Sequence, residues 1–157
     1  MAINWFKYSS PASFYPVAGK LVPLFFVLAL LFLIPGLYIS FFLAPTDAQQ
    51  GEAYRIIFIH VPAAINAQIF FTVSLVTSIL FLVKKNFLWD SISVSCIEVG
   101  TMLVLVNLVT GSIWGRNQWG IWWAWDLRMT SQLMCFLLYL GYLLVRPAIA
   151  EIGRAHV

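Results

Sequence analysis

The chain has 157 residues, of which 62% are hydrophobic and 10% charged, and its nine basic and six acidic side chains give a net charge of +3. A soluble domain of this size could not keep so much apolar surface out of water, so the composition indicates a protein of the lipid bilayer. The positive charge is scattered and contains no run of Lys or Arg that could follow a phosphate backbone, which argues against nucleic-acid binding.

Four apolar runs are each long enough to cross a bilayer, whose hydrocarbon core is roughly 30 Å thick and needs about 20 helical residues. The runs cover residues 21–43, 61–83, 92–114 and 127–145. Pro35 and Gly36 are expected to kink the first helix, and Pro62 suits a first helical turn, where its missing N–H would have no partner anyway. The runs predict one domain with an all-α fold, a polytopic transmembrane helical bundle with four spans.

Basic residues near the span ends predict the orientation of the bundle. Five of them fall on one side of the predicted topology, namely Lys7, Lys20, Lys84, Lys85 and Arg146. The positive-inside rule assigns that side, and with it the N-terminus, to the cytoplasm. The loops 45–60 and 115–126 then share the opposite side of the membrane.

The second of these loops contains most of a tryptophan cluster. Five of the seven tryptophans fall within a dozen residues, at Trp114, Trp119, Trp122, Trp123 and Trp125. One interpretation is an interfacial aromatic belt, although a belt needs only one or two rings per helix end. The other is a flat apolar shelf for a large planar ligand, with Gly115 and Gly120 leaving room for close approach. Asn107, Gly111 and Trp114 follow at helical spacing and form a face that leads into the cluster.

His60 lies on the same side, where the first loop meets the second span. A neutral imidazole there can ligate haem iron, although a lone histidine more often only caps a helix or bonds a neighbour. Haem also carries two propionates, for which Arg55, Arg116 and Arg128 are candidate partners that the sequence does not rank. Asp126 precedes the fourth span, where it is either a helix N-cap or part of the site.

The predicted spans also contain one acidic residue and two cysteines that could have a functional role. Glu98 is a carboxylate within the third span, which makes it either a functional residue or a structural one near the cytoplasmic end. Cys96 and Cys135 belong to no CxxC or CxxCH pattern, so neither thiol exchange nor covalent attachment of haem is expected.

Two segments resemble a known family. Residues 49–64, QQGEAYRIIFIHVPAA, are similar to the region around the first axial histidine of the CcmC family, which handles haem in cytochrome c maturation. Residues 109–130, VTGSIWGRNQWGIWWAWDLRMT, resemble the tryptophan-rich signature of the wider haem-handling superfamily. The second motif is specific to haem handling, and the first separates CcmC from its relatives.

The resemblance implies that haem b is bound non-covalently at the periplasmic face of the bacterial inner membrane, against the tryptophan-rich segment. It implies two axial histidines, the first matching His60, and delivery of haem to the chaperone CcmE beside CcmA, CcmB and CcmD. Such a protein is a carrier and not a turnover enzyme. The family has six spans, and its second axial histidine lies between spans five and six.

The end of the chain departs from the family pattern. Residues 151–157, EIGRAHV, read like a non-native tail, so we expect a truncated chain that lacks the second axial ligand. His156 is predicted on the cytoplasmic side and cannot replace that ligand. Three other functions remain open: a permease subunit of a haem ABC exporter, a component of a related haem lyase such as CcmF or CcsA, and a cytochrome b-like electron carrier. The last would place paired histidines within the spans, and no such pairs occur.

Overall fold

The computed structural model describes residues 10–155, with side chains at 10 and 12–149, and this part of the chain is helical with no strand. The four long helices are α1 (Pro11–Tyr38), α2 (Ile57–Lys84), α3 (Phe87–Trp119) and α4 (Leu127–Ala155). A π-helix, η2 (Ile39–Leu43), extends α1, and a 3-10 helix, η3 (Glu52–Ile56), leads into α2. Four helices are long and apolar enough to cross a membrane, which confirms the predicted fold class.

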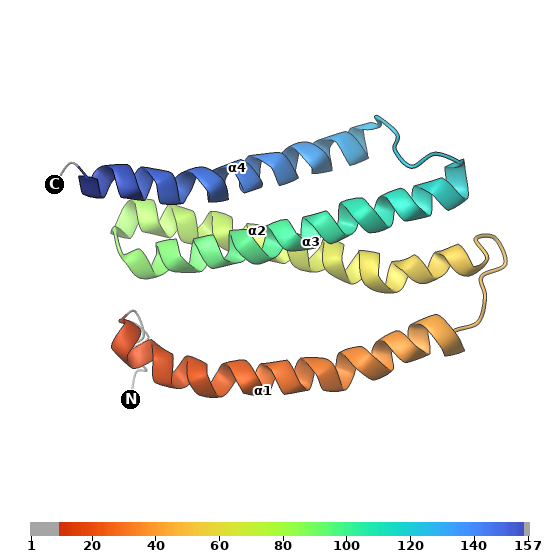
Figure 1. Ribbon diagram of the computed structural model, residues 1–157, viewed down its shortest axis with the longest axis horizontal. Coiled ribbons are helices and arrows are strands. Elements are labelled where there is room, and N and C mark those ends of the chain that lie inside the picture. Colours follow the sequence, from red (N-terminus) through yellow and green to blue (C-terminus); the bar gives the residue numbers. More distant parts are fainter. Residues whose placement is uncertain (1–9, 156–157) are drawn as a thin grey trace.

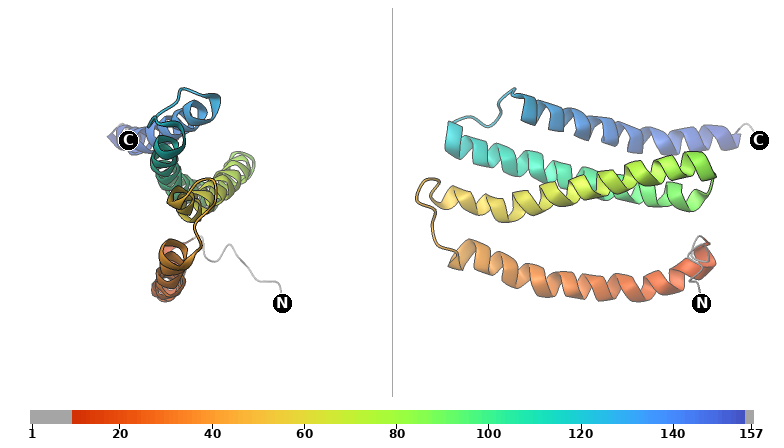
Figure 2. Two further views of the ribbon diagram at one scale, coloured as in Figure 1. Left: turned by 90° about the vertical axis from the view of Figure 1, so that its right-hand side faces the viewer. Right: turned by 180° about the vertical axis from the view of Figure 1, so that it is seen from behind.

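The helices run up and down in chain order, as a row more than a closed bundle. Figure 2 shows α1 at one side and α4 at the other, with α2 and α3 between them. The loops that follow η2 and α3 lie together at one end of the row (Figure 1). The short α2–α3 connection and both ends of the described chain lie at the other end. This arrangement agrees with the prediction that the two unusual loops share one side.

Local sequence explains where the helices begin and end. Pro11 occupies the first turn of α1, where its missing N–H costs nothing. Asn86 caps α3, its side-chain oxygen accepting from the N–H of Leu88 at 2.9 Å. Gly120 ends α3 with φ +75°, a left-handed conformation that glycine adopts without strain. The tight turn before Asn86 is made by Lys85, the one non-glycine residue with positive φ in the described chain.

The core lies between α2 and α3. Its buried apolar residues are small or medium-sized, including Ala63, Ala67 and Val104. Polar groups within it bond across the interface: the Ser93 hydroxyl lies 2.9 Å from that of Ser74 and 2.7 Å from that of Ser78. Small side chains let two membrane helices approach closely, and hydroxyl pairs then link them. Ser74, Ser78 and Ser93 have that role here.

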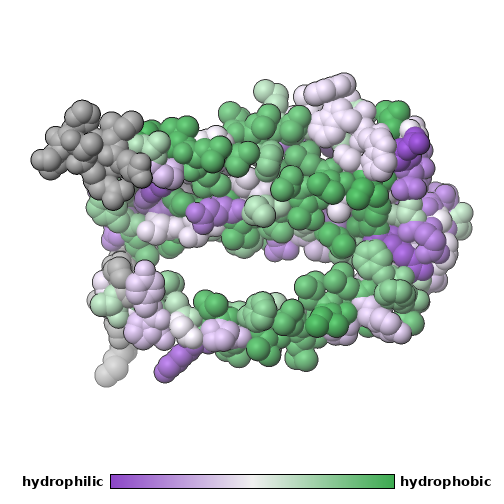
Figure 3. Space-filling view, in the orientation of Figure 1, coloured by the Kyte–Doolittle hydropathy of each residue, from purple (hydrophilic) through white to green (hydrophobic). Residues whose placement is uncertain are grey.

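In contrast, α1 lies apart from the other helices over its middle part. Figure 3 shows a gap there, bordered by mainly hydrophobic surface. At the end of the row that holds the two loops, η2 is bonded to the segment before α2, because Arg55 donates to the Ser40 carbonyl oxygen at 2.9 Å. Thr46 and Glu52 form a second bond across the same loop. The first loop is thereby anchored at both of its ends.

Several predicted boundaries differ from the structure. The third helix runs to Trp119 and not to 114, so only residues 120–126 form the second loop. Pro62 lies inside α2, because the 3-10 segment and the first turn of α2 precede it. Helix α1 starts ten residues before 21 and continues through Pro35. Helix α4 continues to Ala155, well past 145, into the segment predicted as a non-native tail.

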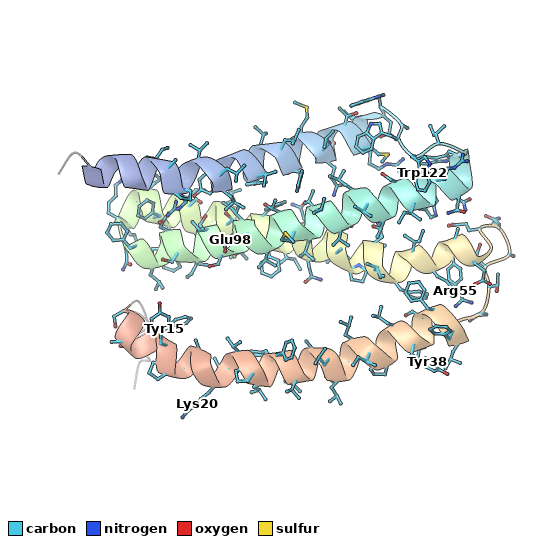
Figure 4. The ribbon with its side chains drawn as sticks, in the orientation of Figure 1. Tyr15, Lys20, Tyr38, Arg55, Glu98 and Trp122 are labelled. Atoms are coloured by element: carbon cyan, nitrogen blue, oxygen red, sulfur yellow. The ribbon has the colours of Figure 1, made fainter. Side chains whose placement is uncertain are left out.

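Two residues used in the predictions, Lys7 and His156, lie outside the described part of the chain. Glu98 is exposed on α3 and forms no ion pair among the described residues (Figure 4). Both cysteines are free thiols, and Cys96 on α3 is buried.

Candidate functional site

A cavity of about 420 Å³ lies at the end of the row that holds the two loops. Its walls come from four parts of the chain: the first loop, the start of α2, the end of α3 and the start of α4. Apolar and aromatic side chains form much of the wall, namely Tyr54, Ile56, Ile57, Leu108, Trp114, Trp119 and Met129. The remaining lining residues are Asp47, Gln50, His60, Asn107, Gly111, Arg128 and Gln132.

His60 is on the wall of this cavity and is held by α3. Its Nδ1 lies 2.8 Å from the hydroxyl oxygen of Thr110. With its amide nitrogen facing the His60 carbonyl oxygen, Asn107 donates to that oxygen at 2.8 Å and accepts from the N–H of Ala64 at 3.1 Å. A Cβ at Gly111 would lie 3.4 Å from Cε1 of the imidazole, at van der Waals distance, so the ring lies directly beside this position of α3. Both the ring and the backbone of His60 are therefore positioned by one turn of α3.

Two of the clustered tryptophans line the cavity. Trp114 and Trp119 are both helical, with ring centroids 5.0 Å apart and planes at 84°. The Trp114 indole N–H donates to the side-chain oxygen of Gln50 at 2.9 Å, which joins α3 to the first loop. Asn107, Gly111 and Trp114, predicted to share a helix face, all line this cavity.

The other three tryptophans follow Gly120 and do not line the cavity. Trp122 and Trp125 are 59% and 77% exposed. The ring of Trp123 contacts that of Trp125 edge to face at 5.6 Å, and its buried indole N–H has no hydrogen-bond partner. The cluster is thus divided between a cavity wall on α3 and an exposed loop, whereas one of the two interpretations of the sequence was a single flat shelf. Figure 4 shows Trp122 at the same end of the molecule as Arg55.

The three candidate arginines have different surroundings. Arg128 lines the cavity, with its guanidinium 5.3 Å from the ring centroid of Trp119 and 3.1 Å from the Asp126 carboxylate. Arg55 is only 12% exposed and is engaged by Glu52 and the backbone of η2. Arg116 donates to the carbonyl oxygen of Gly120, at the end of its own helix. Among the three, only Arg128 faces the cavity.

The family model described as CcmC, heme exporter protein C, matches residues 4–157. The chain belongs to the CcmC family. Heme exporter protein C of Rhodobacter capsulatus is 36% identical over 143 residues, which are 91% of this chain and 59% of that protein. The protein of the same name from Paracoccus denitrificans is 38% identical over 91% of this chain and 59% of its own length.

The same description applies to a protein of Escherichia coli strain K12, which is 36% identical over 83% of this chain and 54% of its own length. The chain therefore spans somewhat more than half the length of the curated relatives it matches. Together with its four apolar helices, CcmC-family membership makes the chain a multi-pass membrane protein.

Asp126 caps α4 in this CcmC-family chain. Its Oδ1 accepts from the backbone N–H of Met129 at 2.7 Å, and its backbone oxygen accepts from Thr130 at 3.1 Å. The Met129 N–H, followed by the Arg128 guanidinium, holds the pKa of this carboxyl below its usual range. Asp126 does not line the cavity, although its partners Arg128 and Met129 do. The capping role that the sequence allowed is the one the structure shows.

Sequence reasoning missed Thr110, which contacts the His60 ring, and Gln50, which bonds the Trp114 indole. Thr110 is three residues after Asn107 and directly before Gly111, so the helical period could have included it in the predicted face. Gln50 and Asp47 carry no comparable signal, because they reach the cavity through the fold of the first loop. In that loop the backbone N–H groups of Gln50 and Gln49 donate hydrogen bonds to Oδ1 of Asp47, and these bonds lower the pKa of the Asp47 carboxyl.

Proposed function

We propose that this chain is the haem-binding part of a carrier that holds haem b non-covalently at the periplasmic face of the bacterial inner membrane and delivers it to the chaperone CcmE in cytochrome c maturation. His60 would be one axial ligand of the iron, and the N-terminus would be cytoplasmic. One observation carries the proposal: a histidine on the wall of a cavity that also presents two indoles and one guanidinium.

The residues of the cavity suit haem. Its volume of about 420 Å³ is within the range of small-molecule sites, roughly 300–1,000 Å³. An iron porphyrin needs a nitrogen donor, apolar contact for the macrocycle and cations for its propionates. His60 supplies the donor, while Trp119, Leu108 and Met129 supply apolar surface. Arg128 is the cation in reach, so we assign a propionate to Arg128 in preference to Arg55 or Arg116.

The longer protein would complete the site. The family resemblance places the second axial histidine in a segment that follows the fourth span, and we propose that this segment closes the cavity. CcmA, CcmB and CcmD are the proposed partners in the membrane. Because the cavity is formed at one end of the helices and not at their middle, we favour a carrier over a permease subunit.

The test is haem titration of the full-length protein in detergent. The wild type is expected to show a low-spin, bis-histidine absorption spectrum, and His60→Ala is expected to lose this spectrum and bind haem more weakly. Gln68→Ala is the matched control, because Gln68 is an exposed polar residue two turns further along α2 and away from the cavity. An unchanged spectrum in His60→Ala would refute His60 as the ligand. Transfer of bound haem to purified CcmE tests the delivery step separately.

A further inference from the structure

The hydroxyl of Thr110 has contacts that determine where its proton is. It lies 2.7 Å from the carbonyl oxygen of Val106 and 2.8 Å from Nδ1 of His60. A carbonyl oxygen can only accept, so the single hydroxyl proton of Thr110 is used in the bond to Val106. The Thr110 oxygen must then accept in the second contact, and Nδ1 of His60 must carry a proton.

That proton fixes the tautomer of the ring. A neutral imidazole has one N–H, so protonation at Nδ1 leaves the lone pair on Nε2. Metals bind the nitrogen that bears the lone pair, and the hydrogen bond made by the other nitrogen decides which one that is. Thr110 does not line the cavity, whereas His60 does. The bond to Thr110 therefore turns Nδ1 toward α3 and reserves Nε2 for a ligand in the cavity.

We infer that Thr110 is a positioning residue that selects Nε2 of His60 as the iron-binding nitrogen. The inference rests on the proposed haem-binding function, but its first consequence exists without haem. A hydroxyl is also a neutral acceptor, so it orients the ring without drawing off its proton as a carboxylate partner would. Such a ligand remains a neutral imidazole, which suits a site that must release haem as well as bind it.

Asn107 and Gly111 support the same orientation from either side of Thr110. Asn107 holds the His60 backbone through its carbonyl oxygen, which limits movement of the Cα from which the ring projects. Gly111 borders the ring on the other side of Thr110, since a Cβ at that position would lie at van der Waals distance, 3.4 Å, from Cε1. These contacts restrain the backbone and the ring of His60. The bond to Thr110 then determines which tautomer the ring adopts.

The first experiment uses the haem-free, full-length protein with ¹⁵N-labelled histidine. At a pH where the ring is neutral, the imidazole nitrogen shifts of His60 are expected to report protonation at Nδ1. Thr110→Val keeps the branched shape but removes the acceptor, so the Nε2–H tautomer should become populated, and Thr110→Ser should restore the wild-type shifts. A wild-type ring protonated mainly at Nε2 would overturn the inference.

The second experiment measures haem affinity and the iron midpoint potential in the same proteins. Thr110→Val is expected to lower ferric haem affinity by about 10- to 100-fold, the usual effect of losing a hydrogen bond to a metal-binding histidine. The potential should rise, because a ring without the Nδ1–H bond is a weaker donor to ferric iron. Thr110→Ser should recover both values.

Thr72→Val is the matched control. Thr72 makes the same bond to its own helix, donating to the Gln68 carbonyl oxygen at 2.7 Å, but it is exposed and does not contact His60. Equal affinity and potential in Thr110→Val and Thr72→Val would overturn the inference while leaving haem binding by His60 in place. If His60→Ala binds haem as the wild type does, the proposed role of His60 as an iron ligand fails instead, and the tautomer measurement still stands by itself.

Discussion

The contact between α2 and α3 at Gly100 leaves no room for a side chain. A Cβ built at Gly100 would lie 2.6 Å from Cε1 and 2.9 Å from Cδ1 of Phe71. Phe71 in turn stacks on Tyr139 of α4, with centroids 4.2 Å apart and planes at 15°. Gly100→Ala is therefore expected to displace Phe71 and to disturb the packing of three helices at once.

The magnitude follows from two opposing terms. Overpacking a well-filled interface costs about 1–3 kcal/mol. Replacing glycine by alanine within a helix gains up to about 1 kcal/mol. Gly141→Ala on α4 receives only the gain, because no atom lies within 4 Å of its Cβ position. Gly100→Ala should thus be less stable than Gly141→Ala by about 1–3 kcal/mol.

Unfolding in mixed detergent micelles, followed by circular dichroism, measures this difference. Phe71→Ala provides an internal check, because removing the ring gives the new methyl group space. In that background the penalty of Gly100→Ala should largely disappear, which a double-mutant cycle reports as a coupling free energy. Equal free energies of unfolding for Gly100→Ala and Gly141→Ala would refute the close approach of the two helices.

Three further outcomes are expected. Arg128→Gln should lower haem affinity by about 10- to 150-fold, since a charged hydrogen bond contributes about 1.5–3 kcal/mol, whereas Arg116→Gln should leave it nearly unchanged in the same titration. Asp126→Asn should lower the midpoint of thermal unfolding at neutral pH, because the pKa of the Asp126 carboxyl is lowered in the folded protein. The difference in midpoint between wild type and variant should be complete above the unfolded pKa of about 3.9, and it should vanish as the pH falls through the folded pKa. Ser93→Ala should reduce the free energy of unfolding by roughly 0.6–1.7 kcal/mol through lost interhelical bonds, and the exposed Ser95→Ala should not.

The four helices could be predicted because hydropathy responds to the bilayer directly, but their ends could not. An apolar run marks only the part of a helix that needs lipid around it. Helix α3 continues five residues past 114, beyond the apolar part, and ends only where Gly120 adopts a left-handed conformation. Similarly, Pro62 correctly indicated that a helix begins nearby. The helical segment begins ten residues before Pro62, however, because η3 precedes α2 without a break.

The site could be predicted in part for a related reason. His60, Trp114, Trp119 and Arg128 meet at the cavity because each lies on or directly beside a helix end at the same side of the membrane. The loop residues between Gly120 and Asp126 could not be placed, since a loop has no period from which a side-chain direction follows. Arg55 was a candidate by charge alone, and only the structure shows that Glu52 and the Ser40 carbonyl oxygen already engage it.

The bonds that orient the His60 ring form during folding, so the ring loses its conformational freedom before any ligand binds. Its bonds to Asn107 and Thr110 form when α2 packs on α3, the most extensively packed pair of helices, and they require no cargo. The entropy of orienting the donor is therefore part of the free energy of folding and does not weaken binding. In the proposed function, a neutral imidazole held in this way would bind iron with little reorganisation, and exchange with a competing ligand would break only the bond at Nε2. Pre-organisation of the ring and ready release would then be compatible in one site, because the first depends on α3 and the second on the ligand atom alone.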